Sequence, residues 1–128
     1  MDIKERLNEF NQGFIKHNKI EFVDTNEEQT ILKVKVSDKS LNPYGIVHGG
    51  LLFGLADTAM GVLAAMTGRQ AVTTTANITY IKPAVGKEIK CIATVIKRGT
   101  TMSHLEAKLY NEKDEVVATA TSSYYNIK

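Results

Sequence analysis

The sequence predicts an α+β fold in which an antiparallel β-sheet surrounds one central, mostly apolar helix. The first observation behind this prediction is an apolar run over residues 51–66 that is rich in good helix formers. The second is a series of segments with alternating or β-branched residues on both sides of that run. A helix that is apolar on nearly every face belongs inside a protein, and a sheet with one apolar face can cover it.

The N-terminal residues predict a second helix, which is amphipathic. Ile3, Leu7 and Phe10 recur at helical spacing with charged and polar residues between them. We therefore expect one helix over residues 2–16, with Asp2 as its cap, packed on the body of the domain.

Six segments have the pattern of β-strands. Residues 20–24 and 29–36 come before the central helix and are separated by a polar turn. Four longer segments follow the helix, separated by three short turns. We expect these four to form an antiparallel meander with the helix against its concave face. Their predicted ranges are residues 71–81, 88–97, 101–110 and 115–125.

Length and composition describe one ordinary globular domain, which we expect to span residues 1–128. Apolar residues make up 43% of the chain, and the net charge of +2 argues against a dedicated nucleic-acid-binding protein. The single cysteine, Cys91, excludes an intrachain disulfide, and its alternating strand pattern is typical of a buried structural thiol. Because the N-terminus lacks the apolar core of a signal peptide, we expect a cytoplasmic protein.

Asp57 is the one charged residue of the central apolar run. A membrane span does not explain the run, which is about 16 residues long where a bilayer requires roughly 20, with Asp57 at its centre. An ionised carboxylate buried without a partner is costly, so a lone Asp on a core helix is rarely there for packing. The charge therefore indicates a functional acid, base or nucleophile.

Gly49 and Gly50 lie at the predicted start of the same helix. Free backbone N–H groups and the positive end of the helix dipole attract an oxyanion there, and glycine lets a substrate approach the backbone closely. Gly49 and Asp57 are eight residues apart, or about 12 Å along an α-helix. A donor and a base that serve one carbonyl must each lie about 3 Å from the reacting atoms. If both groups act together, two antiparallel copies of the helix are needed, which predicts an obligate homodimer with two composite sites.

The motifs around the central helix have a fairly specific spacing. Asn42 lies six residues before His48-Gly49-Gly50, and Asp57 lies nine residues after His48. With the neighbouring segments Ala56-Asp57-Thr58-Ala59 and Ala76-Asn77-Ile78-Thr79-Tyr80-Ile81-Lys82-Pro83, this pattern resembles the acyl-CoA thioesterases of the hotdog fold. The branch is the PaaI-like and human thioesterase superfamily member 2-like group, and the likeness runs from about residue 20 to residue 125. It implies homodimers that commonly assemble into homotetramers.

The resemblance implies roles for five residues around the scissile bond. Asp57 acts on the thioester carbonyl, either as a general base on water or as the nucleophile. The N–H of Gly49 polarises the thioester oxygen, and the side-chain amide of Asn42 orients the attacking water. His48 shapes the oxyanion loop or contacts the substrate, and Thr73 assists near the leaving group or the water.

Three of these residues also have a purely structural alternative. Asn42 can cap a turn before Pro43, and His48 can bond the backbone of its own loop. Thr73 lies in a run of three threonines that a β-strand favours.

Coenzyme A carries an anionic nucleotide, so basic residues are expected near the mouth of the site. Lys82, Lys97 and Arg98 lie at strand ends, and Gly99 allows a phosphate to approach the backbone. The resemblance often places nucleotide contacts at the position of Arg98-Gly99, and Gly50 completes the expected substrate contacts. Plain solvation is the alternative for these surface lysines.

The leading hypothesis is hydrolysis of an acyl-CoA to a carboxylic acid and free CoA, without a metal or a redox cofactor. Three scattered histidines and one cysteine show no ligand spacing. The alternatives are an enoyl- or hydroxyacyl-CoA hydratase-dehydratase of the same fold and a non-catalytic acyl-CoA-binding module. The former pairs a catalytic His with an acid in a different local pattern, and Asn42 together with Asp57 weighs against the latter. The sequence does not choose between an aryl and a fatty acyl group as the acyl part of the substrate.

Overall fold

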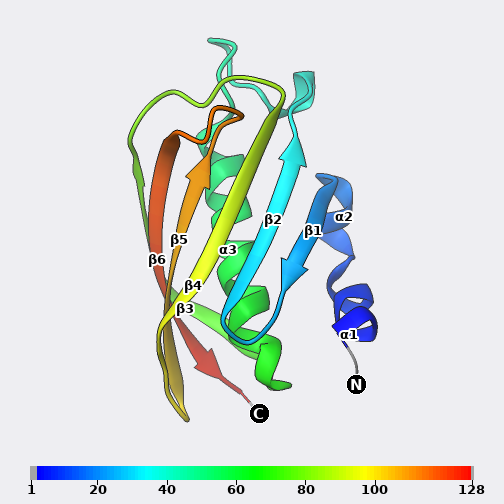
Figure 1. The fold of residues 1–128 in the computed structure, drawn as a ribbon, viewed down its shortest axis with the longest axis vertical. Helices are drawn as coiled ribbons and strands as arrows, with labels where there is room; N and C mark the ends of the chain where they lie inside the picture. Colours follow the sequence, from blue (N-terminus) through cyan, green and yellow to red (C-terminus); the bar gives the residue numbers. More distant parts are fainter. Residues whose placement is uncertain (1–2, 128) are drawn as a thin grey trace.

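The computed structural model describes residues 3–127, and its six strands form one antiparallel sheet (Figure 1). Every predicted strand is present, with each end within one residue of its predicted position. The strands are β1 (Ile20–Thr25), β2 (Gln29–Lys35), β3 (Ala71–Tyr80), β4 (Glu88–Arg98), β5 (Met102–Tyr110) and β6 (Val116–Asn126). Their order in the sheet is β1-β2-β4-β5-β6-β3.

The predicted meander of the last four strands is wrong for β3. β4, β5 and β6 are successive neighbours, but β3 pairs with β6, and β4 pairs with β2. The connection over residues 81–87 is longer than a hairpin turn and contains Pro83, which has no N–H for a strand ladder. The N–H of Val47 donates to the carbonyl oxygen of Ala84 at 2.9 Å, which holds this connection as it crosses the end of the sheet.

The predicted central helix is α3 (Gly49–Ala64), which the short helix η2 (Ala65–Thr67) continues. It runs along the concave face of the sheet (Figure 1) and packs against β2, β3, β4, β5 and β6. The side chains of Leu55 and Leu63 are fully buried there. By length and composition alone, Gly49–Thr67 could cross a membrane. Its buried packing against the protein's own sheet is the behaviour of a core helix.

The predicted single N-terminal helix is in fact two helices, α1 (Ile3–Phe10) and α2 (Gly13–His17). Between them Gln12 is extended, with φ of −141° and ψ of 167°, and Gly13 has φ of +51°. Glycine is a poor helix former and takes positive φ without a steric penalty, so the helix breaks here. Both helices lie beside β1 (Figure 1). The predicted cap, Asp2, lies outside the described residues.

β3 forms one edge of the sheet, and its outer side has no partner strand among residues 3–127. It carries two exposed large apolar side chains, Val72 and Tyr80, and Phe53 is partly exposed on α3. A long free edge with apolar side chains is a template for pairing with another chain.

Candidate active site

Asp57 lies in the middle of α3, and its carboxylate is directed toward β3 and β6. The Thr73 hydroxyl donates to Asp57 Oδ1 at 2.8 Å, and the Tyr124 hydroxyl donates to the same oxygen at 2.7 Å. Thr73 and Tyr124 face each other across the β3–β6 ladder, which explains why both reach this carboxylate. In the described part of the chain nothing bonds Oδ2. One oxygen is therefore fixed by two donors, while the other can take a proton or attack a carbon.

Tyr124 is the residue of this group that sequence reasoning missed. Its side chain is only 2% exposed. Burial raises the pKa of the Tyr124 phenol above its ordinary value, and the charge of Asp57 acts in the same direction. The phenol therefore stays protonated and remains a donor near neutral pH. A signal was present, because the alternation of β6 directs Tyr124 inward and a buried Tyr hydroxyl needs a polar partner.

His48 caps the start of α3, and its side chain accepts a hydrogen bond from one of the two glycine N–H groups. The Gly50 N–H donates to His48 Nδ1 at 2.7 Å, so that nitrogen carries no proton. The prediction of two free glycine amides is therefore wrong for Gly50, and the structural role foreseen for His48 is present. No acceptor among the described residues bonds the Gly49 N–H, whereas the Tyr80 hydroxyl donates to the Gly49 carbonyl at 2.8 Å. One free donor remains at the positive end of the helix.

The free amide and the carboxylate lie on one unbroken helix. Gly49 and Asp57 are eight residues apart within α3, which places them about 12 Å apart along its axis. Each must come within about 3 Å of the atoms of one thioester carbonyl. A single subunit therefore does not bring both groups to one substrate carbonyl.

Asn42 holds the loop that leads to α3. Its Oδ1 accepts from the N–H of Tyr44 at 2.9 Å and from the N–H of Ile46 at 3.2 Å. This bonding is the structural alternative that the sequence allowed. The Nδ2 group has no acceptor within residues 3–127 and is free to bind a water or a substrate.

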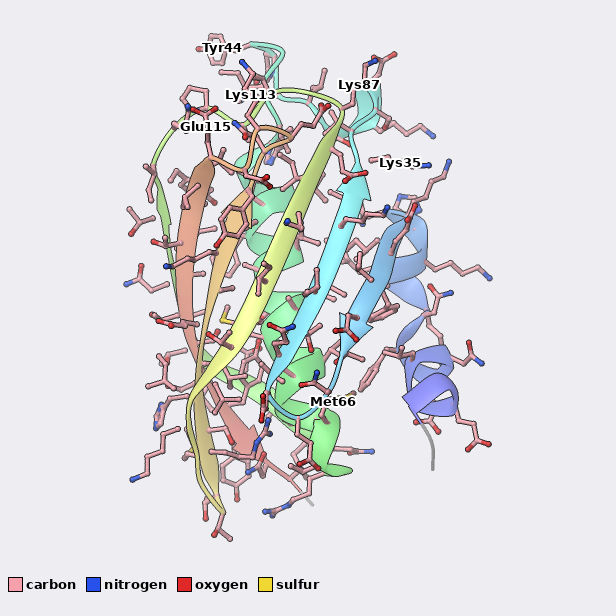
Figure 2. The ribbon with its side chains drawn as sticks, viewed as in Figure 1. Lys35, Tyr44, Met66, Lys87, Lys113 and Glu115 are labelled. Atoms are coloured by element: carbon pink, nitrogen blue, oxygen red, sulfur yellow. The ribbon has the colours of Figure 1, made fainter. Side chains whose placement is uncertain are left out.

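The basic residues predicted to bind CoA lie at opposite ends of one subunit. Lys82 bonds Glu115 at 2.8 Å and lowers the pKa of the Glu115 carboxyl. Figure 2 shows Glu115 at the end of the molecule opposite Met66, which lies just beyond α3. Lys97, the last residue but one of β4, is exposed at the other end of the sheet.

Arg98 and Gly99 have structural roles that their positions in the sequence did not indicate. The Arg98 guanidinium donates to the carbonyl oxygens of Ala64 at 3.2 Å and Glu27 at 2.9 Å. It therefore caps the last turn of α3, where free carbonyls and the negative dipole end attract a cation. At Gly99 a Cβ would collide with the carbonyl oxygen of Met102, so the β4–β5 turn requires glycine. Phosphate binding by either residue stays a prediction.

A cavity of about 630 Å³ adjoins the Asp57 carboxylate. Its floor is the helical face that continues from Asp57 through Gly61 in α3 to Ala65, the first residue of η2. The N-terminal helices supply one wall, and the beginning of β3 with the end of β6 supplies the other. A carbonyl group placed at the Asp57 end of this cavity can therefore carry a sizeable substituent along α3.

Cys91 is fully buried in the core, and burial raises the pKa of its thiol. This confirms the prediction of a structural thiol, because a reactive cysteine needs an accessible thiolate. Within residues 3–127 no three His, Cys, Asp or Glu side chains are grouped so that they could hold a metal ion.

The antiparallel sheet wrapped around one central helix defines a class of protein, the hotdog fold. The Escherichia coli PaaI protein, from the phenylacetic acid degradation operon, matches with a TM-score of 0.91 over 97% of this chain and 91% of that chain. At 23% identity this likeness concerns the fold alone. The profile of the family described as the Thioesterase superfamily matches residues 44–118, more than half of the chain, and the chain belongs to this family.

Two further similarities bear on the branch. Acyl-coenzyme A thioesterase 13 of Mus musculus is 33% identical over 97 residues, which are 73% of this chain and 69% of that protein. A Streptococcus mutans protein solved with acetyl CoA bound is 30% identical, with a TM-score of 0.79 over 84% of this chain and 87% of that chain. The predicted resemblance and the predicted hotdog fold are thus confirmed.

Proposed function

We propose that this chain, as one domain over residues 1–128, hydrolyses an acyl-CoA thioester to a carboxylic acid and free CoA. The observation that carries the proposal is the Asp57 carboxylate, whose Oδ1 is held by Thr73 and Tyr124 at the edge of a large cavity. A carboxylate held in this way can act on a carbonyl carbon in that cavity through Oδ2. The names of the relatives support the substrate class, since one is an acyl-coenzyme A thioesterase and another was solved with acetyl CoA.

Two routes from this carboxylate lead to the same products. As a general base, Asp57 Oδ2 takes a proton from a water whose oxygen attacks the thioester carbon. As a nucleophile, Oδ2 attacks that carbon itself and forms a mixed anhydride, which water then cleaves. In both routes negative charge develops on the thioester oxygen and the C–S bond breaks. The departing CoA sulfur takes up a proton, which comes from Asp57 in the first route and from the water that cleaves the anhydride in the second. Thr73 contributes by orienting the carboxylate through Oδ1.

The donor for the developing oxyanion is the N–H of Gly49 of the partner subunit in this proposal. Two antiparallel copies of α3 place the Gly49 end of one beside Asp57 of the other when they cross near Phe53, four residues from each. Phe53 is 36% exposed on a helix whose other large side chains are mostly buried, which supports a contact there. The free edge of β3, with exposed Val72 and Tyr80, supports the same interface.

The remaining contacts follow from the same homodimer. The free Nδ2 of Asn42 orients the attacking water, and His48 holds the loop that presents the oxyanion donor. Because the helices run antiparallel, the end of one subunit that carries Lys97 approaches the end of its partner that carries Lys82. Both lysines are then available to the CoA phosphates, with Arg98-Gly99 beside them and Gly50 at the helix start. Assembly of two dimers into a homotetramer, and a cytoplasmic location, are proposed on the resemblance and the composition alone.

Release of free thiol from a panel of aryl- and fatty acyl-CoAs tests the proposal, with Asp57→Asn and Asp57→Ala as variants. Asn keeps an oxygen for Thr73 and Tyr124 but cannot serve as a base or as a nucleophile. General-base catalysis typically contributes about 100- to 10,000-fold, so we expect kcat to fall by at least about 100-fold in both variants. Circular dichroism and a melting curve control for folding.

Three outcomes would contradict the proposal. Unchanged hydrolysis in both variants would remove Asp57 from its assigned role. Thioester binding without turnover would favour a binding module, and reversible hydration of an enoyl-CoA would favour a hydratase.

A further inference from the structure

We propose that the cavity beside Asp57 binds the acyl group as an unbranched aliphatic chain of about ten carbons, and that Gly61 keeps the path of this chain open. This inference rests on the proposed thioesterase function. It commits to one occupant, the acyl part of the thioester, because the cavity is continuous with the carboxylate that would act on the carbonyl carbon.

The size of the cavity favours a chain over a single aromatic ring. Its volume is about 630 Å³, whereas an apolar protein cavity of about 150 Å³ already holds benzene. The floor runs from Asp57 in α3 to Ala65 at the start of η2, eight residues or about 12 Å. A C–C bond of about 1.5 Å advances an extended chain by roughly 1.3 Å, so this length suits about nine methylene groups.

The lining of the cavity combines apolar side chains with polar ones such as Glu9, Thr58 and Gln70, and apolar atoms make up the larger share of its surface. Phe10 and Ile15 contribute from the N-terminal helices, and Val72 and Ile127 contribute from the opposite wall. Ile127 is 47% exposed, whereas the exposed Val72 also lies on the β3 edge that the proposed homodimer would cover. Large apolar side chains that stay open to solvent around a cavity are typical of a site that an apolar ligand covers.

Gly61 differs from the other glycines of α3 in the space around it. A Cβ at Gly54 would lie 2.6 Å from Phe14 Cζ, one at Gly50 would lie 2.9 Å from His48 Nδ1, and one at Gly49 would lie 3.2 Å from the Tyr80 ring. A close neighbour accounts for each of these three glycines.

At Gly61 no such neighbour is present. The nearest heavy atom to a Cβ there would be Tyr124 Cε2 at 3.5 Å, an ordinary van der Waals contact. Alanine would also form a better helix at this position. Packing therefore gives no reason for glycine, and its effect is to leave the cavity open one turn beyond Asp57, where the first carbons of an acyl chain would lie.

A size series at this position tests the inference. We would measure kcat/KM for acetyl-, hexanoyl-, decanoyl- and phenylacetyl-CoA with the wild type, Gly61→Ala and Gly61→Leu. The wild type should prefer decanoyl-CoA to both acetyl- and phenylacetyl-CoA. Each methylene kept out of the cavity should cost about fourfold in kcat/KM. The decanoyl-to-acetyl ratio should therefore fall slightly with Ala and by more than about tenfold with Leu.

The decanoyl-to-acetyl ratio separates a specificity role from a folding defect. A folding defect would lower kcat/KM for both substrates together. Gly61→Ala keeps the test valid if Gly61→Leu does not fold, since its Cβ has room. An unchanged ratio in the Gly61 variants, or a wild type that prefers phenylacetyl-CoA, would overturn this inference and leave the thioesterase proposal standing. Absence of hydrolysis with every substrate would overturn the thioesterase proposal itself.

Discussion

The Asp57 carboxylate is oriented by one cross-strand pair. Thr73 on β3 and Tyr124 on β6 face each other in the ladder and donate to the same oxygen of Asp57. Hydrogen bonds to a charged group contribute about 1.5–3 kcal/mol each, which offsets the cost of partly burying the charge. Because both donors bind Oδ1, they fix the direction of Oδ2 without occupying it.

Replacing Tyr124 with Phe removes one of these donors and keeps the ring. We expect the free energy of unfolding at neutral pH to fall by about 1.5–3 kcal/mol, because a hydrogen bond to a charged group is lost. The difference should shrink as pH rises above the ordinary Tyr pKa of 10.0. The unfolded phenol then releases its proton while the native one, with its raised pKa, keeps it, so the wild type loses stability and the Phe variant does not.

Urea unfolding of both proteins at about pH 8 and about pH 10.5 checks this prediction. Tyr125→Phe is the matched control, since Tyr125 is the exposed neighbour on the same strand. A stability difference for Tyr124→Phe that does not change with pH would show that the phenol does not titrate as described.

At the scale of residues, the sequence could indicate Asp57 but only part of its surroundings. A lone charge in an apolar helix is visible in any sequence, and Thr73 came from the resemblance. Tyr124 is 67 positions from Asp57, and only the register of β3 on β6 brings it to the carboxylate. The bulge between Thr73 and Thr75 shifts that register locally, which strand periodicity cannot reveal.

Among the elements, α3 contributes both the Asp57 carboxylate in its middle and the free Gly49 amide at its start. The amide can be tested separately from the carboxylate. Gly49→Pro removes the N–H, and proline is well tolerated at the first position of a helix. His48, with φ of −59° and ψ of 133°, already has the backbone conformation that a following proline favours. Gly49→Ala is the matched control, because it adds a Cβ near the Tyr80 ring but keeps the N–H.

The Pro variant should have a kcat about 100- to 1,000-fold below that of the Ala variant, as expected when one oxyanion donor is lost. Their melting temperatures should be similar, because the Gly49 N–H has no acceptor among the described residues. Equal kcat values for Pro and Ala would remove this amide from the mechanism.

Local pattern predicted the elements well and their neighbours less well. Apolar periodicity and turn residues gave every strand and the central helix. The pairing of β3 with β6 joins distant segments, and no local pattern encodes which strand a long connection will reach. The N-terminal helix was predicted too long because Gly13 was read as part of a helical period, although glycine favours a break there.

At the scale of the whole molecule, one subunit holds both of the groups proposed to react but keeps them about 12 Å apart on α3. The partly exposed Phe53 and the free edge of β3 lie on elements that a second copy can cover. The family assignment does not determine this assembly. Activity should therefore depend on pairing of subunits, with each site built from two chains.

Complementation between two inactive variants tests this central claim most directly. Asp57→Ala and Gly49→Pro subunits would be co-expressed with different affinity tags, purified through both tags, and assayed for thiol release. In a mixed dimer, the intact Asp57 of the Gly49→Pro subunit meets the intact Gly49 of the Asp57→Ala subunit. One of the two sites is therefore complete. Because purification through both tags selects mixed dimers, one intact site in two predicts about half of wild-type activity. Mixed protein no more active than either variant alone, or a wild-type chain that turns over substrate as a monomer, would contradict a site shared between subunits.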